Sequence, residues 1–192
     1  DLLDAASLDK IPTDIDVAYY LVHSMSTSDN YRSLEQESAI NFRNKLSTTA
    51  VKQVIYLSGI INESNLSKHL LSRKAVEEEL EKGSFNFTCL RAGIIVGSGS
   101  ASFEIMRDLV EKLPVMITPK WLLTKCQPIG VSDVLKFLTA SILKEETFNR
   151  NFDIGCDDVL SYKEMLLEIA NVRKLKRKIW TVPVMTPRLS SY

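Results

Sequence analysis

The sequence has no glycine before Gly59, no net charge and no long apolar run. A membrane-spanning helix needs roughly 18 or more consecutive apolar residues. None of the 192 residues lies in such a run, so no transmembrane helix is predicted. The 24 lysines and arginines are balanced by 24 aspartates and glutamates, which leaves no overall attraction to nucleic acid or anionic lipid. A small molecule is therefore the predicted partner.

Cysteine is scarce and scattered. Cys89, Cys126 and Cys156 are odd in number and far apart, which fits neither a disulfide framework nor a zinc-binding spacing. We therefore expect reduced cysteines, a cytoplasmic protein and no metal site. The first ten residues carry no basic start and no apolar signal core, so secretion is not predicted. Because the chain lacks an initiator methionine, we expect it to begin inside a longer protein or to have been trimmed.

Three continuous apolar runs are predicted to form strands covered on both faces, as in a parallel sheet. They occupy residues 17–23, 54–58 and 87–96. Between them, apolar residues recur at near-helical spacing over 34–46 and 68–82. Strands and helices alternating at these lengths are typical of a doubly wound α/β sheet.

The second half of the chain contains helical patterns separated by shorter extended pieces. Helices are predicted over 102–113, 131–143 and 161–172. The last of these begins with Ser161 and has Glu164 three positions later, the pattern of a capping box. The basic run at 173–178 follows. A solvated helix end explains this run better than a nucleic-acid site does.

Small and polar residues lie at the carboxyl ends of the three predicted strands. In open α/β sheets, ligands bind beyond these ends. Each residue taken alone is equally explained as a strand terminus or turn, but three such ends on one sheet favour a site. The residues are His23, Ser24 and Met25 after the first strand, Ser58 and Gly59 after the second, and Arg91, Ala92 and Gly93 in the third.

Several of these segments, in this order, resemble a known protein family. The quoted segments are DVAYYLVHSM (16–25), VKQVIYLSG (51–59), SKHLLSRKAVE (67–77), LRAGIIVGSGS (90–100) and CQPIGVSDV (126–134). Together they are similar to extended, atypical short-chain dehydrogenases/reductases, in the NAD(P)-binding branch related to NmrA-like proteins and nucleoside-diphosphate-sugar epimerases. The resemblance covers nearly the whole chain.

The resemblance implies a Rossmann-like doubly wound parallel sheet with a small α/β C-terminal substrate lobe. On this basis, residues 1–100 would form a partial NAD(P)-binding domain, and 101–192 a substrate lobe interleaved with the end of the sheet. The cofactor would be NAD or NADP, a homodimer is expected, and no nucleic acid or membrane partner is implied.

The implied cofactor-binding residues follow from matched positions. The segment from His23 to Met25 matches a loop beside the adenosine and ribose, and the segment from Arg91 to Gly93 matches one that passes the nicotinamide. Gly59 ends the strand that bears Ser58. Asp1 and Leu2 match a pair that lies by the adenine. The family's glycine-rich turn has no counterpart here, so we expect about the first third of the nucleotide-binding half to lie outside this chain.

The chain also departs from the family at the catalytic pair. The family has tyrosine and lysine four residues apart on the helix after the serine-bearing strand, and here His69 and Arg73 occupy those positions. Arg73 could hold a ribose or phosphate because it is always charged. His69 could donate a proton near neutral pH, with Ser58 polarising a carbonyl. A surface role for His69 stays open.

Three residues are predicted to bind substrate in the C-terminal lobe: Phe103, Trp121 and Gln127. Core packing explains the two aromatic residues equally well. The resemblance implies an oxidoreductase or epimerase acting on a carbonyl or sugar-like small molecule. The alternative is a non-catalytic NAD(P)-binding redox sensor or scaffold that has lost the Tyr–Lys pair.

Overall fold

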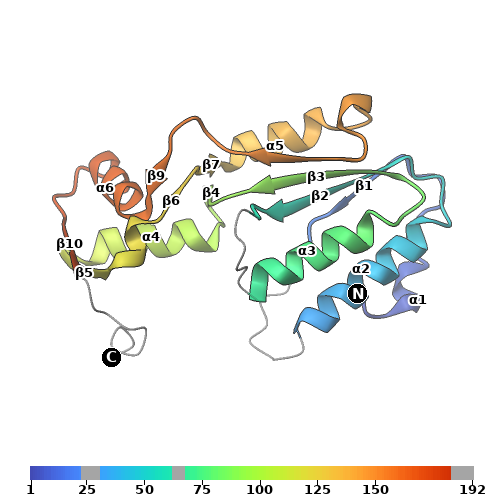
Figure 1. The fold of residues 1–192 in the computed structure, drawn as a ribbon, viewed down its shortest axis with the longest axis horizontal. Helices are drawn as coiled ribbons and strands as arrows, with labels where there is room; N and C mark the ends of the chain where they lie inside the picture. Colours follow the sequence, from blue (N-terminus) through green and yellow to red (C-terminus); the bar gives the residue numbers. More distant parts are fainter. Residues whose placement is uncertain (23–30, 62–67, 183–192) are drawn as a thin grey trace. The chain divides into compact units, whose positions relative to one another are not determined.

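The computed structural model of the chain describes residues 1–22, 31–61 and 68–182. Its central feature is a parallel sheet of four strands in the order β1–β2–β3–β8 (Figure 1). The strands are β1 (Val17–Tyr20), β2 (Gln53–Gly59), β3 (Asn86–Ala92) and β8 (Arg150–Ile154). This sheet confirms the predicted doubly wound α/β class.

The predicted strands differ from the observed ones at their carboxyl ends. The run predicted over 17–23 is a strand only as far as Tyr20. The run predicted over 87–96 divides, because β3 ends at Ala92 and the next short strand, β4 (Ile95–Val96), pairs with β7 (Ile129–Gly130) instead of the main sheet. Hydrophobicity marks a buried extended segment, but it does not identify the strand that pairs with it.

Two helices cover one face of the sheet, α2 (Tyr31–Leu46) and α3 (Lys68–Leu80), as Figure 1 shows. Their apolar sides and the facing strand residues form the first hydrophobic core. Its members include Tyr20, Phe42, Tyr56, Leu80, Phe85 and Phe87. On the other face, the Tyr19 hydroxyl donates to the Leu138 carbonyl oxygen at 3.0 Å. The side chains of Tyr19 and Tyr20, which are consecutive on β1, therefore point to opposite faces of the sheet, as the pleat of a strand requires.

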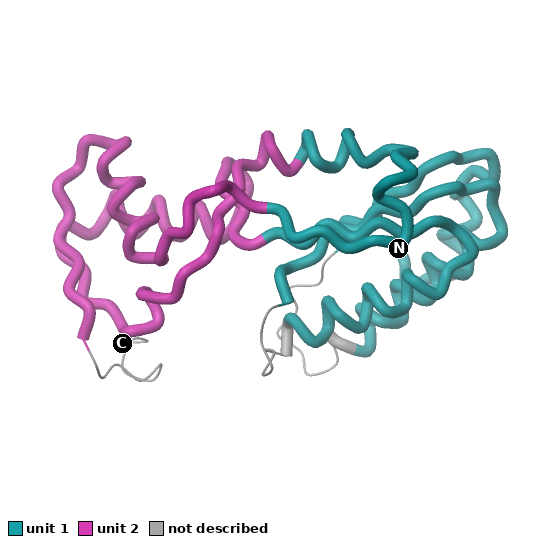
Figure 2. Tube along the Cα trace, turned by 45° about the horizontal axis from the view of Figure 1, so that its top comes forward, with its two compact units in different colours: residues 1–92, 135–154 teal, residues 93–134, 155–192 magenta. Residues whose placement is uncertain are grey.

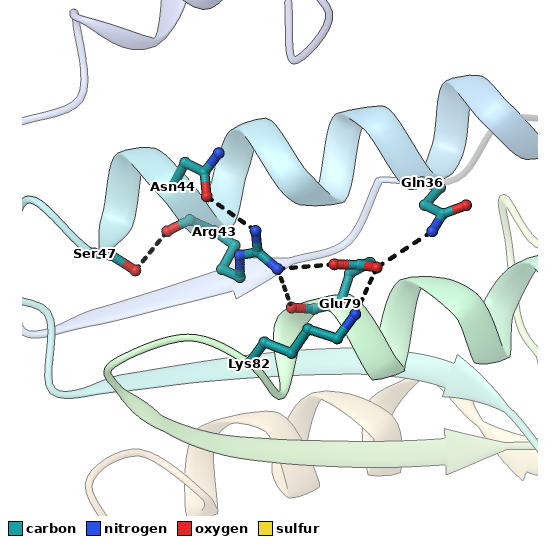
Figure 3. Close-up of polar contacts among 6 residues, drawn as sticks. All are labelled: Gln36, Arg43, Asn44, Ser47, Glu79 and Lys82. Carbon is teal, nitrogen blue, oxygen red and sulfur yellow. Dashed lines mark hydrogen bonds and ion pairs between the residues drawn. The ribbon is translucent and has the colours of Figure 1, made fainter.

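A polar network centred on Glu79, near the C-terminal end of α3, joins this helix to α2 (Figure 3). Arg43 Nη1 lies 2.8 Å from Glu79 Oε2, and Lys82 Nζ lies 2.8 Å from Glu79 Oε1. Gln36 Nε2 donates to the same Oε1 at 3.2 Å. The hydrogen bond from Lys82, with smaller contributions from Gln36 and Arg43, lowers the pKa of the Glu79 carboxyl. The network therefore depends on the ionised form of Glu79.

Replacing Glu79 by glutamine is expected to lower the free energy of unfolding by about 1–2 kcal/mol at neutral pH. A carboxyl with a depressed folded-state pKa stabilises the fold fully above its unfolded pKa, near 4.5. That contribution is lost as the pH falls through the lower folded pKa. In urea denaturation, the difference between Glu79→Gln and the parent should therefore shrink below pH 4.5.

The matched control is Glu81→Gln, because Glu81 is exposed and has no ion pair among the described residues. It should change stability little at any pH. A Glu79→Gln deficit that stays constant well below pH 4.5 would show that the carboxylate charge is not the source of the effect.

The chain forms two compact units, drawn in different colours in Figure 2. Unit 1 contains residues 1–92 and 135–154, and unit 2 contains 93–134 and 155–192. The pairing of β8 with β3 brings residues 135–154 back to the main sheet. The division into 1–100 and 101–192 stays a prediction. Within the described residues, no helix combines the length and apolar character needed to cross a bilayer.

Unit 2 is built on α4 (Ala101–Lys112), α6 (Tyr162–Val172) and a parallel pair formed by β5 (Val115–Pro119) and β10 (Lys178–Val182). Its core contains Met106, Val110, Met116, Leu122, Leu166 and Ile179. The predicted capping box is confirmed: Ser161 caps α6, and the Glu164 side chain bonds back to the Ser161 backbone.

Shorter elements complete the two units. They are α1 (Ala5–Leu8), η1 (Lys120–Leu123), β6 (Lys125–Cys126), α5 (Val131–Ala140), η2 (Glu145–Thr147) and β9 (Leu160–Ser161). β6 and β9 pair antiparallel.

Candidate functional site

The parallel register places the predicted residues of β2 and β3 side by side at the carboxyl edge of the sheet. Ser58 is opposite Arg91, and Gly59 is opposite Ala92. The connection after β2 stays close to β3, since the Ile60 amide donates to the Ala92 carbonyl oxygen at 3.2 Å. His23, Ser24 and Met25 lie outside the described residues. Two of the three predicted strand ends are thus adjacent.

Ser58 is buried, yet its hydroxyl completes no hydrogen bond with the described part of the chain. Tyr56 lies two residues earlier on the same strand face; burial raises the pKa of its phenol, and the nearby Arg73 and Ser58 side chains partly offset that rise. A buried hydroxyl without a partner costs about 1–3 kcal/mol. Such a group is a ready hydrogen-bond donor for a ligand at this edge of the sheet.

Arg73 lies on α3 beside the end of β2. Its Nη1 donates to the Leu57 carbonyl oxygen at 3.1 Å, and within residues 1–22, 31–61 and 68–182 it has no ion pair with a carboxylate. His69 lies four residues earlier, in the first turn of α3; its side chain is outside what the structure describes. The helix therefore brings a guanidinium without a direct carboxylate partner among the described residues to the strand that bears Ser58.

A cavity of about 450 Å³ lies between the start of the chain, α2, α3 and the ends of β1 and β2. Residues from these elements line it, among them Asp1, Leu2, Tyr20, Glu35, Tyr56 and Arg73. Three of the predicted site residues, Asp1, Leu2 and Arg73, thus meet in one cavity. Ser58, Gly59 and the segment from Arg91 to Gly93 are not among its lining residues.

The segment that carries Asp1 is held against α2. Asn41 Nδ2 donates to the Leu2 carbonyl oxygen at 2.9 Å, and Asp1 Oδ1 accepts the Leu3 amide at 2.9 Å. The buried Glu35 carboxylate accepts a hydrogen bond from the Ser72 hydroxyl on α3. Charged groups of both signs therefore meet around an otherwise apolar cavity.

Sequence reasoning missed two tyrosines in this cavity. Tyr20 and Tyr56 are paired in register on β1 and β2, and their rings pack edge to face at 5.6 Å and 73°. Burial raises the pKa of both phenols, and the Arg73 guanidinium partly offsets this rise. Buried tyrosines usually place their hydroxyl groups against a polar partner. The presence of Tyr20 and Tyr56 inside apolar strand runs was therefore the sequence signal that could have indicated a polar cavity here.

Arg91 is engaged inside unit 1. It forms an ion pair with the buried Glu77 of α3, and its Nε donates to Glu77 Oε2 at 3.2 Å. Cys89 Sγ lies 3.4 Å from the same oxygen. Burial, followed by the Glu77 charge, raises the pKa of the Cys89 thiol. The predicted cofactor role of Arg91 stays a prediction, and its guanidinium is already paired with a carboxylate.

The three predicted substrate residues lie in unit 2, and Trp121 lines a cavity that Phe103 and Gln127 do not line. Trp121 lines a cavity of about 480 Å³ and packs edge to face on Tyr162 at 5.6 Å. Phe103 lies on α4 and is not among the lining residues of that cavity. Gln127 is exposed, and its Nε2 donates to the Cys156 carbonyl oxygen at 2.8 Å.

No protein-family model and no curated protein matches this sequence. Solved structures do match it in fold. A short-chain dehydrogenase/reductase superfamily protein from Agrobacterium tumefaciens with bound NAD has a TM-score of 0.75 at 14% identity, over 95% of this chain and 72% of that one. The dTDP-4-dehydrorhamnose reductase of Bacillus anthracis, in complex with NADP, has a TM-score of 0.79 at 13% identity, over 96% and 73%.

A third structure, RMD from Pseudomonas aeruginosa complexed with NADPH, has a TM-score of 0.76 at 14% identity. The match covers 98% of this chain and 79% of that one. Agreement at this level, with so little sequence identity, comes from the order and pairing of the strands and helices. The chain therefore has the Rossmann-type α/β fold of short-chain dehydrogenase/reductase proteins.

Proposed function

We propose that this chain belongs to an NAD(P)-binding protein of the short-chain dehydrogenase type, in the NmrA-like and epimerase-like branch. Its reaction would be oxidoreduction or epimerisation of a carbonyl or sugar-like small molecule. The observation that carries the proposal is the buried Ser58 hydroxyl at the end of β2, which has no hydrogen-bond partner among the described residues, together with Arg73, which contacts the neighbouring Leu57 carbonyl oxygen. Similar structures bind NAD or NADP, which supports the same choice of cofactor.

The residues present fit part of a dinucleotide. The ribose hydroxyls of a dinucleotide accept hydrogen bonds and its phosphates attract a cation; Ser58 supplies a donor, and Arg73 supplies donors and a permanent positive charge. Asp1 and Leu2 line the cavity that Arg73 also lines, which supports their proposed place beside the adenosine. The pyrophosphate ordinarily binds a glycine-rich turn at a helix N-terminus, and no glycine precedes Gly59 in this chain.

Each residue has a proposed chemical role. The dinucleotide, when bound, supplies or accepts the hydride. Ser58 donates a hydrogen bond to the substrate carbonyl oxygen and so favours negative charge on it. Arg73 holds the ribose or phosphate as a permanent cation. His69 donates or accepts the proton, since an imidazole titrates near neutral pH.

A second candidate function is a non-catalytic redox sensor or scaffold that binds NAD(P). The replacement of the family's Tyr–Lys pair by His69 and Arg73 favours it. The hydrogen bond from Arg73 to the Leu57 carbonyl oxygen also favours the sensor or scaffold, because it links α3 to β2 and so accounts for the arginine by a structural role. We further propose a cytoplasmic location, supported by three unpaired cysteines, and a homodimer.

The first test is a titration of the full-length protein with NADH and NADPH, followed by nicotinamide fluorescence. Arg73→Met should weaken binding at least tenfold, because a charge-assisted hydrogen bond is worth about 1.5–3 kcal/mol. The matched control is Lys74→Met, since Lys74 is exposed and its only ion pair among the described residues is a long one to Glu78 at 3.9 Å. Equal affinities for Arg73→Met and Lys74→Met would remove Arg73 from the site.

His69→Ala separates the two candidate functions. Unchanged dinucleotide binding with lost turnover on a panel of carbonyl substrates would support the enzyme. Binding by the parent protein without hydride transfer to any of these substrates would support the sensor. A folded parent protein that binds neither dinucleotide would overturn both.

A further inference from the structure

The cavity of about 480 Å³ in unit 2 is an apolar groove, and the proposed function uses none of its contacts except the predicted substrate residue Trp121. It lies between α4, β5, η1 and α6 and has the volume of a small-molecule site. Ser102, Thr118 and Tyr162 are its only polar lining residues among those described. No carboxylate, lysine or arginine of the described chain lines it, so a charged group would find no partner inside.

Side chains of this groove are far more exposed than apolar residues of their size usually are. Ile105 is 62% exposed, Ile117 59% and Trp121 60%. Large apolar patches of this kind commonly mark a binding surface. Exposed apolar residues come from α4, β5 and η1, so the groove is bordered by apolar groups on several sides.

A basic hollow adjoins the groove at Val115, which lines both. Lys176, Arg177 and Lys178 contribute to this second hollow. Val115 and Lys178 are paired in register on β5 and β10, so both side chains lie on the same face of the strand pair. The apolar groove thus passes directly into a basic hollow.

The positive charge of this hollow is not neutralised by the described chain. The Arg177 guanidinium donates to the carbonyl oxygens of Glu111 and Lys176, which leaves its charge in place. Lys176 and Lys178 have no ion pair among the residues described. The nearby Glu111 carboxylate forms an ion pair with Arg173, whose Nη2 lies 2.7 Å from Glu111 Oε1.

We propose that this surface binds a single-chain anionic amphiphile, a molecule with one long aliphatic chain and a carboxylate or phosphate head. The chain lies in the apolar groove, and the head lies at Lys176 and Lys178. Burial of the exposed Ile105, Ile117 and Trp121 supplies the affinity, and charge complementarity sets the direction. The inference goes beyond the proposed function: its residues belong to unit 2, whereas Ser58 and Arg73 belong to unit 1. It gives Trp121, predicted above to bind substrate, a place in this groove.

The test is a titration of the full chain with cis-parinarate, a fluorescent long-chain fatty acid. The expected result is saturable binding with one site per chain. The double variant Ile105→Gln/Ile117→Gln should raise the Kd at least tenfold, because two apolar contacts are lost. Both residues are largely exposed, so the fold should persist by circular dichroism. The matched control Val172→Gln, 78% exposed and outside both hollows, should bind like the parent.

The head-group position is tested separately. Lys176→Gln/Lys178→Gln should raise the Kd for cis-parinarate about five- to tenfold and leave the Kd for the corresponding fatty alcohol, measured by competition, unchanged. The parent's preference for the acid over the alcohol should weaken at high salt. An equal loss for acid and alcohol would overturn the assigned direction.

Two further outcomes would overturn the proposal. One is cis-parinarate binding that does not saturate, or a Kd that is the same for Ile105→Gln/Ile117→Gln and the parent. The other is binding to phosphatidylserine-containing vesicles in sedimentation without binding of monomeric cis-parinarate, which would make the surface a membrane contact. Loss of NAD(P) binding in the full-length protein would leave the result for unit 2 unchanged, so the two proposals can fail independently.

Discussion

Replacing Gln53 by methionine is expected to lower the free energy of unfolding by about 3–5 kcal/mol, because it orphans several buried polar groups at once. Gln53 is completely buried at the start of β2. Its Nε2 donates to Thr88 Oγ1 and to the Ser141 carbonyl oxygen, both at 2.9 Å. Its Oε1 accepts the Leu143 amide at 2.6 Å.

The location of these hydrogen bonds explains their large expected contribution to the free energy of unfolding. They join β2 to β3 and to the turn that follows α5, where Leu143 has a left-handed backbone with φ of 49°. That conformation is unfavourable for leucine, and the bond from its amide helps to hold it. Methionine has a similar length but can satisfy neither the Leu143 amide nor the Ser141 carbonyl oxygen.

Urea denaturation followed by far-ultraviolet circular dichroism would measure the loss. Amide exchange should show faster opening at Leu143 and in the strands β2 and β3. The matched control is Gln127→Met, since Gln127 is exposed and its side chain makes one hydrogen bond within the described residues, to the Cys156 carbonyl oxygen. Its cost should stay below about 1 kcal/mol. Similar losses for both variants would contradict the role of the buried network.

Removing Glu77 is expected to have the second-largest effect. Glu77→Met should lower the free energy of unfolding by about 2–4 kcal/mol, because the Arg91 guanidinium loses its carboxylate partner. Glu77 is buried on α3, while the Arg91 side chain is 23% exposed. This partial access to water keeps the expected cost below that of a fully buried pair.

The neighbouring Glu78 provides the matched control. It is exposed, and its ion pair with Lys74 is long, so Glu78→Met should change stability by less than about 0.5 kcal/mol. In a double-mutant cycle, Glu77→Met combined with Arg91→Met should cost less than the sum of the single changes. Strictly additive losses would mean that the pair is not coupled, and would leave Arg91 available for the predicted cofactor contact.

The strands and helices that are buried on one or two faces could be predicted from the sequence, because burial leaves a periodic signal. The apolar run at the centre of β2 and the stripe on α3 are examples. The capping box of α6 was also readable, since its bonds span only three residues. The predicted end of the third strand was less accurate, because strand ends depend on long-range pairing that local sequence does not report.

The candidate site could be predicted only in part. Ser58 was predicted from its place at a strand end and Arg73 from the family resemblance, and both roles stay predictions. Tyr20 and Tyr56 were missed, since each lies in an apolar strand run and resembles a core position in the sequence. Glu35 was missed because a charged residue on an amphipathic helix is usually exposed. Arg91 illustrates the opposite case: its place near a strand end suggested a ligand, whereas its contacts depend on the facing helix.

By itself, the sequence determined the fold class, because continuous apolar runs alternating with amphipathic helices can be buried in few ways. The spacing of His69 and Arg73 on one predicted helix was also readable from the sequence, and their roles stay predictions. Only the tertiary structure decided which polar groups are satisfied: within the described residues it gives the Ser58 hydroxyl no hydrogen-bond partner and gives Arg91 a carboxylate. The physical reason is that hydrogen bonds and ion pairs are short-ranged and directional, so they depend on contacts between segments that lie far apart in the chain.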